Sequence, residues 1–371
     1  MEPPPETLII GAGPAGLAVA ACLKQRRVSC VIVERATTVG SSWHRHYERL
    51  HLHTDRAHSA LPYLDFPAET PRYPSREQLI AYLDHYARHF ELSPRLGEAV
   101  QSVQPCEGGW TTTTTRGVHR SRQLVVATGY NAVPRVPQWP GQERFQGRIL
   151  HSSEYLNGAP FRGQRVLVVG FGNSGGEIAI DLHEHGAQVA LSVRGAVNVI
   201  PREILGLPIL AISLPLCRLP ARVADALAAP LLRLTVGDIT RLGFRKLAVG
   251  PITQIRTTSR VPLIDIGTLR LIREGHIEVL GDVRTVSERT VSFADDGSRS
   301  FDAIVLATGF QPGVDRFLGP EAQGKTGLYF CGFRVSPTGM LRDIAHEARA
   351  IAEHIVRAAA ARLSATHGAA R

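Results

Sequence analysis

Closely spaced cysteine pairs are absent from this chain of 371 residues. Its five cysteines form neither a CxxC nor a CxxxxC motif; they are Cys22, Cys30, Cys106, Cys217 and Cys331. This absence argues against a disulfide reductase and against a zinc or iron–sulfur site, since these functions use paired thiols at short spacing. We therefore expect no bound metal. Unpaired thiols are typical of a reducing compartment, so the sequence predicts a cytoplasmic protein.

Long apolar runs and clustered positive charges are also absent. No stretch of about 18 apolar residues is free of charge, so we expect no transmembrane helix. The N-terminus lacks the basic start and apolar core of a signal peptide. The net charge is +9, but Lys and Arg are scattered, which disfavours a nucleic-acid partner and fits anionic dinucleotides.

Residues 203–236 are apolar but repeatedly interrupted. Arg218 and Arg222 lie among four prolines, which are Pro208, Pro215, Pro220 and Pro230. We interpret the segment as a broken-helix lid over an active site. Peripheral contact with a membrane surface is the alternative, since the segment is amphipathic.

Glycine is placed in two GxGxxG fingerprints. They read Gly11-Ala-Gly13-Pro-Ala15-Gly16 and Gly170-Phe-Gly172-Asn173-Ser174-Gly175. Each follows a strand-like apolar run and opens a helix-like run. The first glycine permits a tight turn, the second leaves room for a pyrophosphate, and the third lets the helix pack on the strand. Two such motifs indicate two dinucleotides and therefore redox chemistry.

The residue that ends the second strand of each unit distinguishes the two sites. Glu34, followed by Arg35, ends the first, and a carboxylate there accepts hydrogen bonds from ribose hydroxyls of FAD or NAD. Arg194 ends the second, where a guanidinium can bind a 2′-phosphate, and Ser192 could add a hydroxyl donor. The sequence thus predicts FAD at the first site and NADPH at the second.

The order of elements predicts an α/β fold with two Rossmann-like dinucleotide-binding domains, the NADPH domain being inserted into the FAD domain. A helix is expected over 75–90 with Ser75 as its N-cap. The strand end Ala-Thr-Gly at 127–129 recurs at 307–309, which we interpret as a return to the first domain. The expected domains are residues 1–155 and 296–371 for FAD, and residues 156–295 for NADPH, with a helical lid at about 201–260.

A last helix is expected from about Leu341 to Ala360. Its positive N-terminal end would lie near the flavin, which makes Met340 and Leu341 candidate FAD contacts.

The segment Phe145-Gln-Gly147-Arg-Ile-Leu-His151-Ser-Ser-Glu-Tyr155 fits the FxGxxxHxxx(Y/F) signature of class B flavin-dependent monooxygenases. Within that class the chain most resembles the plant YUCCA-type indole-3-pyruvate monooxygenases. The similar stretches lie in the family's order along nearly the whole chain. They include GAGPAGLAVAACL (11–23), ATGYNAVPRVP (127–137), GFGNSGGEIAIDL (170–182), LGFRKLAVGPI (242–252) and PLIDIGTL (262–269).

The resemblance implies an activity. NADPH would reduce FAD, reduced flavin would react with O2 to give a C4a-(hydro)peroxyflavin, and the oxygen would pass to a small-molecule substrate. For an aryl α-keto acid such as indole-3-pyruvate, the product would be the shorter acid, indole-3-acetate, as in auxin biosynthesis. The alternatives are an N/S-oxygenase, a Baeyer–Villiger monooxygenase or an uncoupled NADPH oxidase.

The resemblance also suggests site residues. Trp43 matches the family position that approaches the flavin. Gly129, in the turn that ends the Ala-Thr-Gly strand at 127–129, is a further candidate FAD contact. His151 is a catalytic candidate as a hinge or cofactor contact, or else a hydrogen-bonded structural residue. Asn131 either lines the site or caps its loop. Since no Asn precedes Asn131, the Asn that many amine- and sulfide-oxidising relatives carry is missing, which favours the keto-acid activity.

Overall fold

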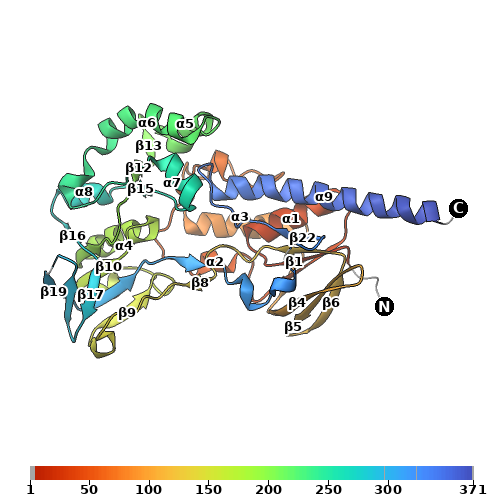
Figure 1. The fold of residues 1–371 in the computed structure, drawn as a ribbon, viewed down its shortest axis with the longest axis horizontal. Helices are drawn as coiled ribbons and strands as arrows, with labels where there is room; N and C mark the ends of the chain where they lie inside the picture. Colours follow the sequence, from red (N-terminus) through yellow and green to blue (C-terminus); the bar gives the residue numbers. More distant parts are fainter. Residues whose placement is uncertain (1–4, 296, 323, 370–371) are drawn as a thin grey trace.

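Two parallel sheets, each of five strands within the described residues, form the cores of two units that lie side by side (Figure 1). The structure, a computed structural model, describes residues 5–295, 297–322 and 324–369. The first sheet has the spatial order β22 (Leu328–Phe330), β7 (Gln123–Val126), β1 (Thr7–Ile10), β2 (Cys30–Glu34) and β3 (Arg95–Leu96). The second has the order β16 (Ile277–Leu280), β11 (Gln188–Ser192), β10 (Arg165–Val169), β20 (Ala303–Leu306) and β9 (Arg148–His151). The predicted α/β class with two Rossmann-like units is confirmed.

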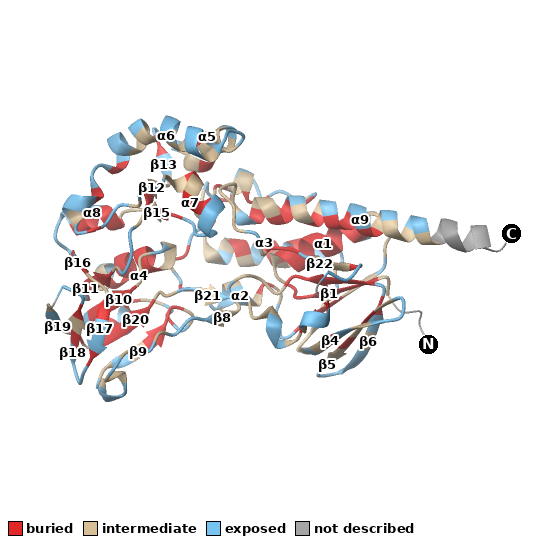
Figure 2. Ribbon diagram, in the orientation of Figure 1, coloured by how far each residue is buried: buried red, intermediate tan, exposed pale blue. Residues whose placement is uncertain are grey.

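Alternating side chains give the first sheet two buried faces, which Figure 2 shows in red. Ile9 of β1 packs in a core formed with α1 (Pro14–Gln25), α3 (Arg76–His89) and α9 (Met340–Ala369). Leu8 and Ile10 pack in a second core around Trp110. That core belongs to an antiparallel sheet of β4 (Val100–Cys106), β5 (Gly109–Thr114) and β6 (Gly117–Ser121).

The second unit repeats this arrangement. Val168 of β10 packs in the core that holds α4 (Asn173–Glu184) and α8 (Thr268–Arg273). Leu167 and Val169 pack in another core, under the antiparallel strands β17 (Val283–Val286), β18 (Thr290–Phe293) and β19 (Ser298–Ser300). Both units thus have helices on one face of a parallel sheet and a three-stranded sheet on the other.

The expected domain boundaries are wrong at two strands. β20 was expected in the first unit, because its Ala-Thr-Gly end repeats that of β7. It pairs instead with β10 in the second sheet, as β7 pairs with β1 in the first. β9 also lies in the second sheet, against β20, although it precedes residue 155. The repeated motif therefore marks equivalent strands of two similar units.

A short antiparallel ladder connects the two units. β8 (Val133–Pro134) pairs with β21 (Phe310–Gln311), where the chain leaves the first unit and returns to it. The chain re-enters the first sheet only at β22, which pairs with β7. α9 follows and extends beyond the predicted end at Ala360 (Figure 1).

The predicted lid is helical. It contains α5 (Ile209–Leu216), α6 (Ala221–Val236) and α7 (Pro251–Thr258), and α6 continues through Pro230. It also includes the hairpin of β13 (Glu203–Ile204) and β14 (Leu207–Pro208), and it is joined to the second unit near β12 (Val199–Pro201) and β15 (Leu263–Asp265). Asp225 of α6 caps α7, accepting from the backbone N–H groups of Ile252 and Thr253 at 2.9 Å each. These two hydrogen bonds connect α6 to α7.

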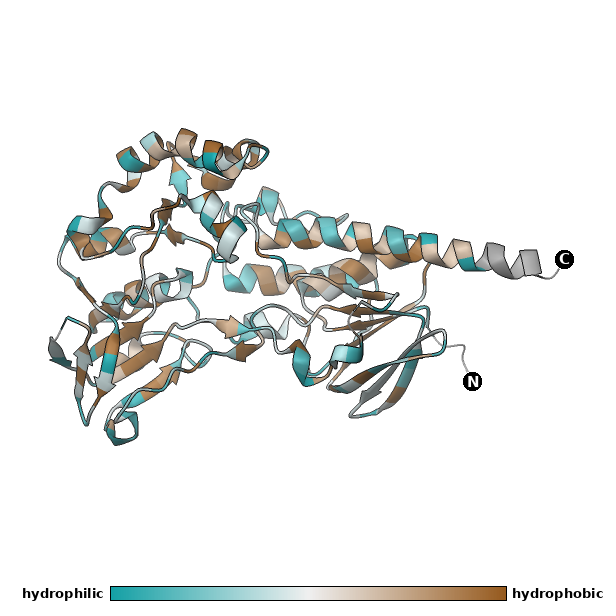
Figure 3. Cartoon of the chain, viewed as in Figure 1, coloured by the Kyte–Doolittle hydropathy of each residue, from teal (hydrophilic) through white to brown (hydrophobic). Residues whose placement is uncertain are grey.

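Hydrophobic and hydrophilic residues alternate along the lid helices (Figure 3). Leu205 and Leu234 are 96% and 84% exposed on this segment. Within the part of the chain that is described, no helix has the length and apolar character needed to span a membrane.

The remaining short helices lie in connections. They are α2 (Ser41–His44) and the single turns Arg56–His58, Gln142–Arg144, Ala159–Phe161, Ile239–Leu242, Val314–Arg316 and Pro320–Ala322.

The predicted cap of α3 is confirmed as a reciprocal pair. The Ser75 hydroxyl accepts from the Gln78 backbone N–H at 3.2 Å, and the Gln78 side-chain oxygen accepts from the Ser75 N–H at 2.9 Å. Two helix-end N–H groups are thereby satisfied.

Ser75→Ala is expected to lower the free energy of unfolding by about 1 kcal/mol, because it exposes an unpaired N–H at the start of α3. Chemical denaturation followed by circular dichroism measures this change. Gln78→Ala, which removes the other half of the pair, should destabilise in the same direction. An unchanged stability in Ser75→Ala would refute the role of the cap.

Candidate functional site

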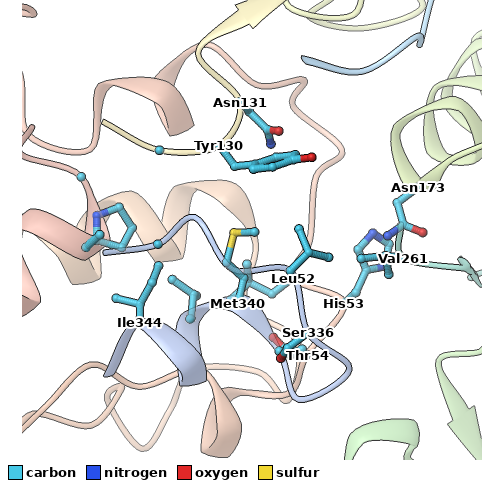
Figure 4. Close-up of a pocket in the computed structure, with 18 of the residues that line it drawn as sticks. Leu52, His53, Thr54, Tyr130, Asn131, Asn173, Val261, Ser336, Met340 and Ile344 are labelled. Atoms are coloured by element: carbon cyan, nitrogen blue, oxygen red, sulfur yellow. The ribbon is translucent and has the colours of Figure 1, made fainter. Parts of the chain in front are cut away.

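A cavity of about 830 Å³ extends from the β1–α1 turn of the first unit to the lid (Figure 4). Its walls combine the first fingerprint, the ends of β2 and β7, the start of α9, and the lid helices. The predicted site residues on these walls are Gly11, Gly13, Ala15, Glu34, Arg35, Trp43, Gly129, Asn131, Asn173, Met340 and Leu341. The fold thus gathers residues that are more than 300 positions apart in sequence around one space.

The three glycines of the first fingerprint differ in what surrounds them. Gly11 has φ +109°, and a Cβ on it would lie 2.6 Å from the Ala127 carbonyl oxygen. A Cβ on Gly16 would lie 1.8 Å from the Gly11 carbonyl oxygen, whereas one on Gly13 would meet nothing within 4 Å. The first and third glycines are therefore required by packing, and the second leaves open space beside the start of α1.

The second fingerprint has the same geometry. Gly170 has φ +107°, and its Cβ would lie 2.4 Å from the Ala307 carbonyl oxygen. A Cβ on Gly175 would lie 2.1 Å from the Gly170 carbonyl oxygen, and one on Gly172 would meet nothing within 4 Å. α1 and α4 both begin without a side-chain cap, so their first N–H groups remain available to an anion. Both cradles fit a pyrophosphate.

The Glu34 carboxylate is buried and fixed at the end of β2. Its two oxygens accept from the backbone N–H groups of Ala12, at 2.8 Å, and Ala36, at 2.9 Å. A carboxylate oxygen accepts more than one hydrogen bond, so capacity remains for ribose hydroxyls on the cavity side. Arg35, beside it, also lines the cavity.

A basic surface lies at the end of β11. Arg194 is exposed there, and the Arg245 guanidinium donates to its backbone carbonyl. Lys246 is exposed beside Arg245 and is bridged to Val197. Arg245 and Lys246, which sequence reasoning missed, come from the lid segment, and Arg245 meets the Arg194 backbone only in the fold.

The predicted role of Ser192 as a phosphate donor is wrong in this structure. Its hydroxyl is buried and donates to the Gly281 carbonyl at 2.8 Å, so its hydrogen is already engaged. The Ser174 hydroxyl interacts with the Tyr47 phenol of the first unit.

Trp43 of α2 lies on the cavity wall with its ring centroid 5.4 Å from that of His46. Burial, and then the neighbouring Arg76 and Arg45, lower the pKa of His46 to about 4. His46 is therefore neutral at pH 7 and adds a polar but uncharged group to the wall.

Asn131 lies beside Tyr130 across the cavity from Met340 and Ile344 (Figure 4). Of the two alternatives left open for Asn131, the structure favours the lining role. Since α9 begins at Met340, its N-terminal end also reaches the cavity, as its predicted role requires.

His151 is not among the residues that line the cavity. It is buried at the end of β9, with Nδ1 3.0 Å from the Ser153 hydroxyl and Nε2 3.2 Å from the Gly309 carbonyl. Its ring stacks edge-on against Phe310, and burial lowers its pKa. Its catalytic candidacy is therefore not supported; the alternative of a hydrogen-bonded residue at the junction of the units fits the contacts.

Two groups of lining residues were not named individually from the sequence, although a lid over an active site was predicted. One is His53, in the segment that follows Trp43. The other is the aliphatic inner surface of the lid, formed by Ile204, Leu210, Ile212, Leu216, Leu227, Leu231, Leu232, Ile252 and Ile255. Helical spacing in the lid could have indicated which of its side chains face the site that it covers.

Comparison with known proteins agrees with this arrangement. Residues 8–202 match the family described as pyridine nucleotide-disulphide oxidoreductase. All five cysteines are free here. Among solved structures, a flavin-containing monooxygenase from Stenotrophomonas maltophilia superposes with a TM-score of 0.72 at 20% identity, covering 96% of this chain and 99% of that one. An oxidized steroid monooxygenase bound to NADP gives a TM-score of 0.76 at 20% identity, with coverages of 96% and 85%.

Sequence similarity is more specific. The chain is 40% identical over 351 residues to the indole-3-pyruvate monooxygenase YUCCA1 of Oryza sativa subsp. japonica, with 89% of this chain and 86% of that protein covered. The chain therefore belongs to the YUCCA-type family of flavin-dependent monooxygenases.

Proposed function

We propose that this chain is an FAD- and NADPH-dependent monooxygenase that oxidatively decarboxylates an aryl α-keto acid, the class to which indole-3-pyruvate belongs. The observation that carries the proposal is one continuous cavity of about 830 Å³, which joins the first fingerprint, Asn173 of the second fingerprint and an aliphatic lid. Redox cofactors and an apolar substrate would meet in that space.

The first fingerprint is assigned to FAD. The open position at Gly13 and the uncapped start of α1 would hold the pyrophosphate, and Glu34 would accept from the ribose. Trp43 and the N-terminal end of α9 line the same space farther along and would flank the flavin ring.

The second fingerprint is assigned to NADPH. Arg194 lies at the end of β11, where a 2′-phosphate would lie, and the Arg245 guanidinium contacts its backbone carbonyl. Two guanidinium groups attract a phosphate dianion and give no comparable advantage to the hydroxyl of NADH.

The lid is assigned to the substrate. Its aliphatic inner side chains would cover an aromatic ring and exclude water from the reacting carbons. Bound flavin supplies the activation of O2, and the protein contributes positioning and shielding. Overall, the keto acid, O2, NADPH and one proton give the shorter acid, CO2, NADP+ and water. The bond between the keto carbon and the carboxyl group breaks, one oxygen atom enters the new acid, and the other leaves in water.

The substrate class is tested by assaying NADPH consumption with indole-3-pyruvate, phenylpyruvate, trimethylamine and a thioether. We expect indole-3-acetate or phenylacetate in amounts that match NADPH consumed, with one atom from ¹⁸O2 in the new carboxyl group. Oxidation of the amine or thioether without keto-acid turnover would instead indicate an N/S-oxygenase. Peroxide release without any oxygenated product would indicate an NADPH oxidase.

Arg194→Ala and Arg245→Ala are each expected to raise the KM for NADPH roughly tenfold and to leave that for NADH nearly unchanged, because each removes a charged contact to the 2′-phosphate. Steady-state kinetics with both coenzymes measure the preference. Arg120→Ala, an exposed arginine of β6 in the other unit, is the control and should have no effect. An unaltered preference in both variants would reject this assignment.

Gly13→Ala and Gly16→Ala form a matched pair. Gly13→Ala should fold normally but purify with little FAD, since its methyl group occupies the space left for the pyrophosphate. Gly16→Ala should misfold or melt at a much lower temperature, since its methyl group overlaps the Gly11 carbonyl. The flavin absorbance ratio and a thermal melt separate the two outcomes. Full FAD content in Gly13→Ala would contradict the assignment.

A further inference from the structure

The outward side of α6 carries an apolar stripe that the rest of the described chain leaves exposed. Val223, Leu227, Pro230 and Leu234 recur at helical spacing, and all four are exposed. The exposed fractions of Val223, Leu227 and Leu234 are 48%, 60% and 84%. A single exposed leucine is ordinary on a protein surface, whereas a continuous apolar stripe marks a contact with another apolar surface.

A basic edge runs beside this stripe. Arg222 and Arg233 are exposed, and each comes one residue before an exposed apolar residue of the stripe, Val223 or Leu234. The two arginines are three helical turns apart, so they lie along the same edge of the helix. In the part of the chain that is described, neither arginine side chain has an ion-pair or hydrogen-bond partner. Both charges therefore remain available to a partner.

The opposite side of α6 faces the cavity. Ala228, Leu231 and Leu232 line that space. Ala224, on the same helix, is fully buried. α6 itself lies at the rim of the molecule, beyond β12 and β15 (Figure 1). The lid thus has an inner face that covers the cavity and an outer face that is exposed.

The charge of the lid restricts what its outer face can bind. All Lys and Arg residues between 205 and 261 are exposed. They are Arg218, Arg222, Arg233, Arg241, Arg245, Lys246, Arg256 and Arg260. The acidic residues of this span are Asp225, which caps α7, and Asp238, which accepts from the Thr240 N–H at 3.0 Å. A second copy of this chain would bring the same positive charge to the contact, whereas an anionic surface supplies the opposite charge.

We propose that the outer face of α6 is a docking surface for an anionic lipid bilayer. An apolar stripe bordered by arginines is typical of a helix that lies in the plane of a membrane surface. The apolar side chains enter the headgroup region, and the arginines extend from the border to the lipid phosphates. Since the inner face of the lid stays on the cavity, this inference is independent of the reaction proposed above.

The test measures binding of the full chain to two kinds of vesicle. One kind contains phosphatidylcholine alone, and the other contains equal parts of phosphatidylcholine and phosphatidylglycerol. Vesicle flotation gives the bound fraction as a function of lipid concentration, at low and at physiological ionic strength. We expect binding to the anionic vesicles that weakens as salt is added, and little binding to the neutral vesicles.

Two double variants test the apolar stripe and the basic edge separately. Val223→Ser combined with Leu234→Ser should weaken binding to anionic vesicles roughly tenfold, since less apolar surface leaves water. Arg222→Gln combined with Arg233→Gln should weaken it roughly twentyfold, since each arginine near an anionic surface contributes about fivefold. Neither change should lower the melting temperature, because these side chains face outward. If the serine variant does not fold, the glutamine variant still tests the surface.

The matched control is Val118→Ser combined with Arg120→Gln. These residues are an exposed valine and an exposed arginine of β6, on the antiparallel sheet of the first unit. This variant should bind both kinds of vesicle as the parent protein does.

The inference is wrong if the parent protein does not bind the anionic vesicles. Parent-like binding by the folded Val223→Ser and Leu234→Ser double variant would mean that charge alone accounts for the attachment. Parent-like binding by the Arg222→Gln and Arg233→Gln double variant would place the attachment on another surface. A parent dimer in sedimentation velocity that becomes a monomer in the serine variant, without vesicle binding by the parent, would assign this face to a second copy of the chain.

Discussion

The close approach of a glycine to the end of a neighbouring strand is the constraint on which both halves of this structure depend. In each unit the first fingerprint glycine lies against the carbonyl of an alanine that follows the adjacent strand, Ala127 or Ala307. The third glycine packs on the first, so the helix starts directly over the strand. With two positions closed by packing, the second glycine is left facing open space, and the helix N-terminus points its free N–H groups there. The fold thus creates an anion site as a result of its own packing.

The two units share one cavity because several segments cross between them. The short ladder of β8 and β21 joins the sheets, and the lid covers the cavity that they share. Residues of the lid segment serve two different surfaces. Its aliphatic side chains line the cavity, whereas Arg245 reaches outward to Arg194. The contact between His53 and Glu177, at 2.9 Å, is a further crossing point, and the Glu177 side chain is only 2% exposed there.

Sequence reasoning was most reliable where local geometry limits the choice of residue. The two strand–turn–helix units and the cap at Ser75 were predicted and are confirmed, because positive φ values and unpaired helix-end N–H groups impose specific residues. It was wrong for β20, where the repeated Ala-Thr-Gly was interpreted as a return to the first unit. The Ala-Thr-Gly motif is repeated because the first fingerprint glycine of each unit packs against the alanine of one such motif. The repeat therefore indicates that the two units are similar, and it does not indicate which sheet the strand joins.

The sequence by itself determined that this chain has two strand–turn–helix fingerprints with opposite charges at the ends of their second strands, since each depends on contacts within a few neighbouring residues. Only the tertiary structure decided which predicted residues share a space. In the fold, His151 contacts the Gly309 carbonyl at the junction of the units, and the Ser192 hydroxyl donates to the Gly281 carbonyl. The Arg245 guanidinium donates to the Arg194 carbonyl. The reason is that a hydrogen-bonding side chain acquires its role from the partner it meets. Those partners lie 51 to 158 positions away in the chain, and no local pattern records them.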